Sequence, residues 1–559
     1  MQITNRINFR NFSGDLFGGI TAAVIALPMA LAFGVASGAG PTAGLYGAVI
    51  VGFFAALFGG TPTLISEPTG PMTVIMTAVI ANLTAATGDT DKGLAMAFTV
   101  VMMAGVFQIL FGLLRLGKYV TLMPYTVVSG FMSGIGVILV ILQLAPFLGS
   151  KSPKGGVLGT LGALPNLISN LNSAALILSA LTVATIVLVP ILVPTQLKRW
   201  FPPQLIALLL GTFLSVWFFS GSNLDRIGVI EAGLPTLRMP VFTGSELQLM
   251  IVDALILSVL GCIDALLTSV VADSLTRTEH NSNKELIGQG IGNLVSGMCG
   301  GIAGAGATMG TVVNIQAGGR TALSGLIRAM ILMVVVLWAA PLTQSIPYAV
   351  LAGIALKVGI DIIDWGFLKR AHTVSWKAAA IMYGVIALTV FVDLMVAVGI
   401  GVFIANILTI DRLSTLQSKS VKAITDADDQ IQLTPEEKRL LDQGQGRILL
   451  FHLSGPMIFG VAKAISREQK ALKYCEALIL DLSDVPHMGV TSSLTIENAI
   501  EEAIDKGCNV FIVGATGQIK RRLEKLGIWA RIPPQHLLAD RTEALRQSVT
   551  ALDGYATSS

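Results

Sequence analysis

Long apolar runs follow one another through the first 410 residues, with short polar turns between them. A helix needs about 20 mostly apolar residues to cross the hydrocarbon core of a bilayer. Most of these runs therefore predict membrane-spanning helices. Fourteen runs can be distinguished, at 16–36, 43–59, 71–83, 94–114, 119–148, 173–193, 204–219, 250–272, 286–299, 307–317, 322–340, 346–360, 376–392 and 394–410.

The pattern changes in the last part of the chain, where the apolar stretches become short. They predict strands at 447–453, 477–482 and 509–513, and helices at 494–506, 520–526 and 542–552. Alternation of strands and helices is typical of an α/β sheet. We therefore expect three parts: a transmembrane domain at 1–410, a charged linker at 411–446 and an α/β domain at 447–559. Within the linker, Thr434 to Glu437 resembles the start of a helix.

The distribution of charge supports this division. Residues 1–410 carry 34 charged side chains, about 8%, whereas residues 411–559 carry 37, about 25%, which is the average for soluble proteins. The whole chain is 53% hydrophobic with a net charge of +3. This excludes an ordinary soluble globule, a disordered chain and a nucleic-acid binder that depends on bulk positive charge. The four cysteines form no pattern of a disulfide framework or a zinc site.

Loop charges predict the orientation in the membrane. With the N-terminus inside, the loops on the cytoplasmic side carry twelve Lys and Arg residues and the opposite loops carry five. This agrees with the positive-inside rule. We therefore expect a multi-pass protein of the plasma (inner) membrane with both termini, and hence the α/β domain, in the cytoplasm.

Two of the runs, 71–83 and 307–317, are too short to span the bilayer, and each is the third in its set of seven. Pro68 and Pro71 lie at the start of the first, and the glycine-rich segment 301–306 precedes the second. We expect both to enter the membrane as extended chain and to continue as half-helices. A matched pair of interrupted spans indicates the substrate site of a transporter, and two facing helix N-termini favour an anion. Alternatively, the glycines only let helices pack closely.

The eighth run contains a buried acid. Asp264 lies in its middle, and Thr268 lies one helical turn later on the same face. A carboxylate at this depth is costly and is functional by default. With freed backbone carbonyls nearby, it would suit a small cation such as Na⁺; a proton relay or a protonated structural acid are the alternatives.

Other charges in or near the runs are weaker candidates for function. Glu67 could cap or pair, and Arg328 and Lys357 could snorkel or pair with an acid. Three acids lie at predicted span ends, where helix capping is the expected role: Asp361, Asp364 and Asp393.

Three motifs carry a resemblance to a known family. They are ALPMALAF at 26–33, GLYG at 44–47 and NIQAGGRTALSG at 314–325. On these motifs the chain resembles the SulP (sulfate permease) family of anion transporters, whose members end in a cytoplasmic STAS domain. The resemblance implies an α-helical polytopic protein of 14 spans in two inverted seven-span repeats, divided into core and gate domains. It also implies elevator-type alternating access and a homodimer, which we expect to form through the STAS domain.

Within this family the chain is most similar to sodium-dependent bicarbonate importers. Many relatives carry a Ser-Arg pair where this chain has Met309 and Gly310, and a Gln where it has Met29. A desolvated anion still needs a compensating charge, and a sodium ion at Asp264 could provide it. Anion binding would then favour sodium binding and the reverse. The resemblance places sodium at Asp264, Thr268, Gly306 and Thr308, and bicarbonate at Thr69, Ala307 and Thr308.

These observations predict a secondary transporter that imports bicarbonate with sodium as the coupling ion and without any cofactor. Transport of sulfate or chloride by exchange, or an anion channel, both without sodium coupling, are the alternatives on the same scaffold. A receptor that signals through its tail is a further alternative. No nucleophile–base constellation or metal motif occurs, so we do not expect an enzyme.

The loop at 481–493 is similar to the signature loop of STAS domains. In STAS switch proteins an Asp shortly precedes a phosphorylated Ser or Thr, and here Gly489 replaces the Asp while Thr491 occupies the acceptor position. Phosphorylation of Thr491 is therefore a hypothesis; a helix N-cap and a dimer surface are the alternatives. We expect His452 and His487 to be packed or exposed rather than metal ligands.

Overall fold

Helices occupy all fourteen apolar runs. The computed structural model describes residues 4–5, 9–120, 124–192, 202–219, 221–228, 233–339, 343–392, 394–418, 421–425, 431–457 and 475–556. The helices of the first seven runs are α1 Phe12–Ala36, α2 Pro41–Phe58, α3 Gly70–Thr87, α4 Thr90–Leu113, α6 Tyr125–Phe147, α8 Ser173–Leu192 and α9 Pro203–Trp217. Those of the second seven are α10 Leu247–Thr276, α11 Ser282–Met298, α12 Thr308–Gln316, α13 Ala322–Val334, α15 Tyr348–Ile362, α17 Trp376–Phe391 and α18 Leu394–Ser418.

Shorter helices connect these segments: α5 Gly117–Val120, α7 Gly156–Ser169 and α16 Trp365–Val374. In the described part of the chain, seven helices are long and apolar enough to cross a membrane, namely α1, α2, α3, α4, α6, α8 and α10. The count of fourteen spans stays a prediction.

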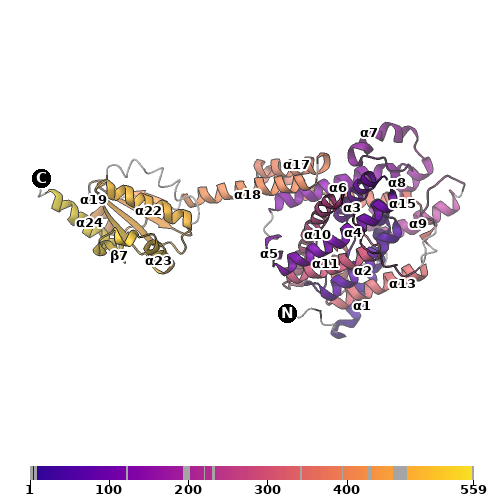
Figure 1. Ribbon diagram of the computed structural model, residues 1–559, viewed down its shortest axis with the longest axis horizontal. Coiled ribbons are helices and arrows are strands. Elements are labelled where there is room, and N and C mark those ends of the chain that lie inside the picture. The colour runs from indigo at the N-terminus through magenta and orange to yellow at the C-terminus, as the bar shows by residue number, and fades with distance from the viewer. Residues whose placement is uncertain are drawn as a thin grey trace. The chain divides into compact units, whose positions relative to one another are not determined.

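The two sets of seven helices pack reciprocally. α1 packs on α13 as α10 packs on α4, and α6 packs on α17 as α15 packs on α8. Likewise α1 contacts α12 as α10 contacts α3. An approximate twofold relation between the sets produces this exchange of partners. Two groups result, one of α1–α4 with α10–α13 and one of α6, α8, α9, α15 and α17, as the core and gate division predicts. Figure 1 shows the helices of both groups packed in one bundle.

Small residues let helices of the first group approach closely. An added Cβ on Gly44 of α2 would lie 2.0 Å from the carbonyl oxygen of Ala30 in α1. On Gly105 of α4 it would lie 2.5 Å from the carbonyl oxygen of Gly290 in α11. Backbones this close have no room for a larger residue, as is common between membrane helices.

The two interrupted segments meet each other as short strands. β1 Ser66–Glu67 and β2 Ala305–Gly306 pair antiparallel, with Ser66 opposite Gly306 and Glu67 opposite Ala305. β1 leads into α3 and β2 leads into α12, so the extended entry that the prolines and glycines predict is confirmed.

The expectation of two half-helices is correct only for α12. α12 has nine residues, but α3 has 18 and is therefore about 27 Å long. The prediction for α3 was wrong because it ended the element at the last apolar residue, Leu83. The helix continues through Thr84–Thr87 and ends at Gly88, which has a left-handed backbone conformation.

The C-terminal unit is a five-stranded sheet of strand order β3-β4-β5-β6-β7. All neighbouring pairs are parallel except β3 with β4. The strands are β3 Val421–Ile424, β4 Ile448–Ser454, β5 Ala477–Asp484, β6 Asn509–Val513 and β7 Leu537–Leu538. The helices are α19 Pro435–Gln443, α22 Val490–Asp505, α23 Gly517–Lys525 and α24 Arg541–Ala556.

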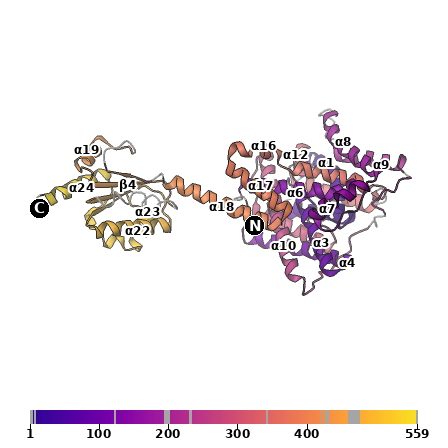
Figure 2. The ribbon, with the colours of Figure 1, turned by 90° about the horizontal axis from the view of Figure 1, so that it is seen from above.

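Alternate residues of the strands fill two separate hydrophobic clusters. Leu449 and Leu478 belong to a cluster that includes side chains of α22 and α23, whereas Leu450 and Ile479 belong to one with side chains of α19 and α24. Figure 2 shows α19 and α22 on opposite sides of the sheet. This packing explains why the strand segments are continuous apolar runs in the sequence. Parallel strands that are covered on both faces are apolar at nearly every position.

The structure differs from the predicted linker at 411–446. α18 continues to Ser418, and β3 and α19 belong to the sheet and core of the C-terminal unit. The division by internal contacts falls between Phe403 and Ile404. The predicted helix start is confirmed, because Thr434 and Glu437 form a reciprocal capping box.

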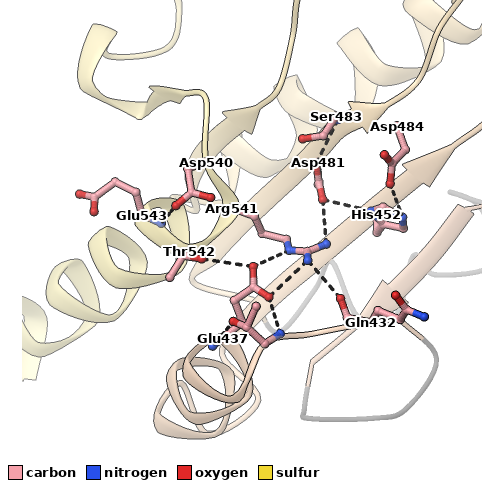
Figure 3. Close-up of polar contacts among 11 residues, drawn as sticks. Gln432, Glu437, His452, Asp481, Ser483, Asp484, Asp540, Arg541, Thr542 and Glu543 are labelled. Atoms are coloured by element: carbon pink, nitrogen blue, oxygen red, sulfur yellow. Dashed lines mark hydrogen bonds and ion pairs between the residues drawn. The ribbon is translucent and has the colours of Figure 1, made fainter.

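A buried polar cluster joins the elements of this unit (Figure 3). Arg541 at the start of α24 donates to Glu437 of α19 at 2.9 Å and to Asp481 of β5 at 3.2 Å. His452 of β4 contacts Asp481 at 3.0 Å through Nδ1 and Asp484 at 3.5 Å through Nε2. Burial raises the pKa of Asp481, but hydrogen bonds from His452 and Ser483 outweigh it and lower the pKa to about 2.

Candidate anion and cation site

The N-termini of α3 and α12 come together where β1 pairs with β2. The N–H groups of the first helical turn have no partner within a helix, and they form the positive end of its dipole. The two ends are unequal. In α12 the first three residues, Thr308 to Gly310, all carry an N–H, whereas Pro71 removes one from α3. The amide of Ala307 is already used, because it donates to the carbonyl oxygen of Ile65 at 2.8 Å.

Asp264 of α10 faces this junction. It accepts a hydrogen bond of 2.7 Å from the hydroxyl of Thr69, the residue that precedes α3. Thr69 is at the N-cap position but its side chain does not cap α3. Both residues are at least nine-tenths buried, with 7% of Asp264 and 8% of Thr69 exposed. The predicted cation ligand and a predicted anion ligand are therefore in direct contact.

Thr268 joins the same junction one turn further along α10. Its hydroxyl donates to the carbonyl oxygen of Gly306 at 2.9 Å and lies 2.9 Å from the hydroxyl of Thr308. Because a hydroxyl has one hydrogen, Thr308 must be the donor if both bonds form. An added Cβ on Gly306 would lie 3.0 Å from the Cα of Ala265, so a larger residue would require a small shift of β2 or α10.

The structure thus brings all six predicted site residues to one place. Their oxygen atoms are a carboxylate, hydroxyls and a backbone carbonyl, which are the hard ligands that a small cation prefers. No group of three His, Cys, Asp or Glu side chains that could hold a metal ion occurs among the described residues. The assignment of the six site residues to sodium or to bicarbonate stays a prediction.

The site opens on the side of α12. Thr308 and Met309 are exposed, while Gly310 is buried. Gln204 of α9 donates to the sulfur of Met309 at 3.6 Å. A helix of the second group therefore reaches the edge of the site.

Polar residues of α11 hold the chain before β2, and the sequence analysis missed them. Asn293 accepts from the amide of Gly304 at 2.8 Å and donates to its carbonyl oxygen at 2.9 Å. Ser296 donates to the carbonyl oxygen of Ile302, and Gln289 donates to the hydroxyl of Ser66 in β1 at 2.6 Å. Gln289, Asn293 and Ser296 are spaced by four and three positions, so a polar stripe on an apolar helix was the available signal.

Five of the other charges singled out in the sequence have structural partners. Glu67 and Arg328 pair with each other in the interior, as the sequence analysis allowed. Lys357 pairs with Asp361 on the surface. Asp364 accepts from the amide of Phe367 at the start of α16, which confirms its capping role. Asp393 lies outside the described residues.

Thr491 is exposed in the first turn of α22. The N-cap of this helix is Gly489, so an N-cap role for Thr491 was wrong. Its phosphorylation stays a prediction. His452 is packed against Asp481 and His487 is exposed, as expected.

Comparison with known proteins gives matches to both parts of the chain. Residues 12–385 match the Sulfate permease family and residues 440–543 match the STAS domain. The bicarbonate transporter BicA of Synechocystis sp. is 71% identical over 552 residues, which cover 99% of this chain and 97% of that protein. The BicA protein of Picosynechococcus sp. is 68% identical over 554 residues, again 99% and 97%.

Two solved structures resemble this one. The transmembrane domain of a cyanobacterium bicarbonate transporter BicA is 72% identical, with a TM-score of 0.67 over 71% of this chain and all of that one. The overall structure of SLC26A9 has a TM-score of 0.81 over 99% of this chain and 92% of that one. At 17% identity the second comparison shows a shared fold alone.

Proposed function

The chain belongs to the sulfate permease family, and we propose that it is a secondary transporter that imports bicarbonate by sodium symport. The two BicA proteins support bicarbonate as the substrate, because the identity extends over nearly the full length of each. Neither proposed ligand needs a cofactor, since sodium is the coupling ion and travels with the anion.

The contact between Thr69 and Asp264 is the observation that carries the sodium coupling. The hydroxyl of Thr69 has one hydrogen, and it is donated to Asp264 at 2.7 Å. While this bond exists, Thr69 cannot donate to an anion. A sodium ion bound at Oδ2 of Asp264 would compete with this hydrogen bond and so release the hydroxyl. Sodium would thus favour anion binding, and the anion would favour sodium binding to the same degree.

The donors and acceptors around the two helix ends suit bicarbonate. Bicarbonate is both a hydrogen-bond donor and an acceptor, and hydroxyls such as that of Thr308 can play either part. The α12 end has Gly310 in place of a basic side chain, so sodium is the proposed source of the compensating charge.

Uptake into proteoliposomes tests this function. Labelled bicarbonate, sulfate and chloride are offered in turn, with and without an inward sodium gradient. We expect bicarbonate uptake that rises with the sodium gradient, and little uptake of the other two. Sulfate or chloride uptake that does not depend on the sodium gradient would instead support the alternative of uncoupled anion exchange or a channel.

The Asp264→Asn variant tests the cation ligand in the same assay. The amide cannot supply the negative charge that sodium needs, so we expect sodium-stimulated uptake to be lost while the protein still inserts. Glu279→Gln is the matched control, because Glu279 is exposed just beyond α10. Sodium stimulation that survives in Asp264→Asn removes Asp264 from the cation site.

We also propose that the transporter is a homodimer of the plasma membrane, with both termini in the cytoplasm and the STAS domain at the dimer contact. The measurement is the mass of the detergent-purified protein by light scattering, for the full chain and for a chain that ends at Ser418. A dimer of the full chain and a monomer of the shorter one is the expected result.

A further inference from the structure

A buried charged pair lies next to the proposed site, and the proposed mechanism does not use it. Arg328 of α13 is fully buried and Glu67 of β1 is 5% exposed. Their side chains form an ion pair between Nη2 and Oε2. Burial of a charged group costs roughly several kcal/mol in desolvation, and the attraction between the partners often only offsets this cost. The pair by itself is therefore weak evidence that it stabilises the fold. What the guanidinium holds in place is the more informative question.

The same guanidinium also binds backbone from two other elements. Its Nη1 donates to the carbonyl oxygen of Ala48 in α2 and to that of Ser66 in β1, each at 3.1 Å. Ser66 lies opposite Gly306 in the strand pair, and Glu67 lies opposite Ala305. Arg328 thus connects α13, α2 and both residues of β1, and β1 in turn holds β2.

Gly52 of α2 makes room for this contact. An added Cβ at this position would lie 2.5 Å from Nη1 of Arg328 and 2.9 Å from the carbonyl oxygen of Ser66. The charge of Glu67 balances that of Arg328, so the pair has no net charge with which to attract an anion. The geometry is that of a brace on the backbone.

We propose that Arg328 is a positioning residue for transport: it fixes β1 against α2 and thereby sets the placement of the two helix N-termini that bind the ions. This inference rests on the proposed function. Arg328 touches neither ion. A lysine is a poor substitute, because one ammonium lacks the planar fork that reaches Ala48, Ser66 and Glu67 together.

The experiment measures half-saturating bicarbonate and sodium concentrations for the full chain in proteoliposomes. We expect Arg328→Met and Arg328→Lys to raise both by about tenfold or more, because small displacements of binding groups have effects of this size. Gly52→Ala keeps both charges and should shift both concentrations in the same direction. Arg320→Gln, at an exposed arginine, and Gly384→Ala, at a glycine with open space around it, are the matched controls.

The double variant Glu67→Gln with Arg328→Met separates two roles of Arg328: positioning of the backbone, and balancing the charge of the buried Glu67. It contains no unpaired charge, so it remains informative if Arg328→Met alone fails to insert. Positioning through Ser66 and Ala48 predicts that the double variant stays impaired. Wild-type affinities in the double variant, or in Gly52→Ala, overturn the inference. If the wild type itself shows no sodium-dependent bicarbonate uptake, the proposed function fails instead.

Discussion

At the residue scale, the site depends on a few oxygen atoms whose hydrogen bonds can be counted. The carboxylate of Asp264 has Thr69 as a partner, and the hydroxyl of Thr268 is committed to Gly306. We propose that an ion competes with these existing bonds for the same oxygen atoms. The exchange of one partner for another, rather than the filling of an empty space, is what links the two proposed ligands.

Thr69→Val should separate anion binding from cation binding. Valine has the shape of threonine without the hydroxyl. The loss of a hydrogen bond to a charged ligand is about 1.5–3 kcal/mol, so we expect the half-saturating bicarbonate concentration to rise about tenfold or more. Sodium binding without bicarbonate should not weaken, because its competitor for Asp264 is gone.

Isothermal titration with sodium and uptake of labelled bicarbonate measure the two effects. Thr69→Ser, which keeps the hydroxyl, is the control and should remain close to the wild type. A wild-type bicarbonate affinity in Thr69→Val would show that Thr69 is not an anion ligand.

The sequence was sufficient for some site residues and insufficient for others. Asp264 stands out because a carboxylate in the middle of an apolar run is rare, and Thr268 follows from helical spacing. The backbone partners of Asn293 and Arg328 could not be predicted, because they depend on how the chain folds. Gly304 approaches Asn293 through an irregular turn of the chain, and Ala48 and Ser66 lie 280 and 262 residues before Arg328. Neutral polar residues such as Gln289 also carry no strong signal on a membrane helix.

At the element scale, two strands of two residues each define the geometry of the site. Prolines and glycines predicted that the chain is extended at both places, but the strand pairing and its register depend on tertiary contacts. The length of α3 was misjudged for a different reason, since threonines beyond Leu83 end an apolar run without ending a helix. Polarity and helix boundaries are separate properties.

Asn293→Ala should loosen the segment before β2. The variant leaves the amide and the carbonyl oxygen of Gly304 buried without their side-chain partner, at about 1–3 kcal/mol for each group. We expect a lower midpoint of thermal unfolding in detergent and a lower rate of uptake. Asn166→Ala, on the exposed side of α7, should change neither. An unchanged midpoint in Asn293→Ala would mean that Gly304 needs no such support.

At the scale of the whole molecule, composition predicted two parts, and the contacts give two units. β4, β5 and β6 and helices α22, α23 and α24 were found because their apolar runs are short and regular, whereas β7, a strand of two residues, was missed. β3 and α19 were assigned to a linker because charge dominates that stretch, yet one face of each supplies apolar side chains to the core, Ile424 from β3 and Leu441 from α19. High local charge therefore does not exclude an element from a folded domain.

The polar cluster around Arg541 predicts a pH dependence for the C-terminal unit. The folded pKa of Asp481 is about 2, and burial of Glu437 is outweighed by its bonds to Arg541 and Thr434, so its pKa is also lowered. In an unfolded chain both groups titrate near pH 4. Their contribution to the free energy of unfolding is thus fully present above about pH 4–5 and is lost as the pH falls towards 2.

The midpoint of urea unfolding of the C-terminal unit at pH 7, 5 and 3 measures this loss. The unit has two hydrophobic clusters of its own, so we expect it to fold separately. Arg541→Gln should lower the urea midpoint at pH 7 and should make the midpoint decrease less between pH 7 and pH 3. Arg546→Gln, at an exposed ion pair, should have neither effect. Equal acid sensitivity in Arg541→Gln and the wild type would exclude the pair of Arg541 and Glu437 as its cause.

The pairing of β1 with β2 limits how cargo can cross the bilayer. The two strands pair with each other. Arg328 and Gln289 join β1 to neighbouring helices, and Asn293 joins Gly304, the residue before β2, to α11. The two strands therefore cannot separate to let an ion pass between them without breaking these buried bonds. We expect translocation to displace the strand pair and the two helix N-termini together, with the ions still bound between them.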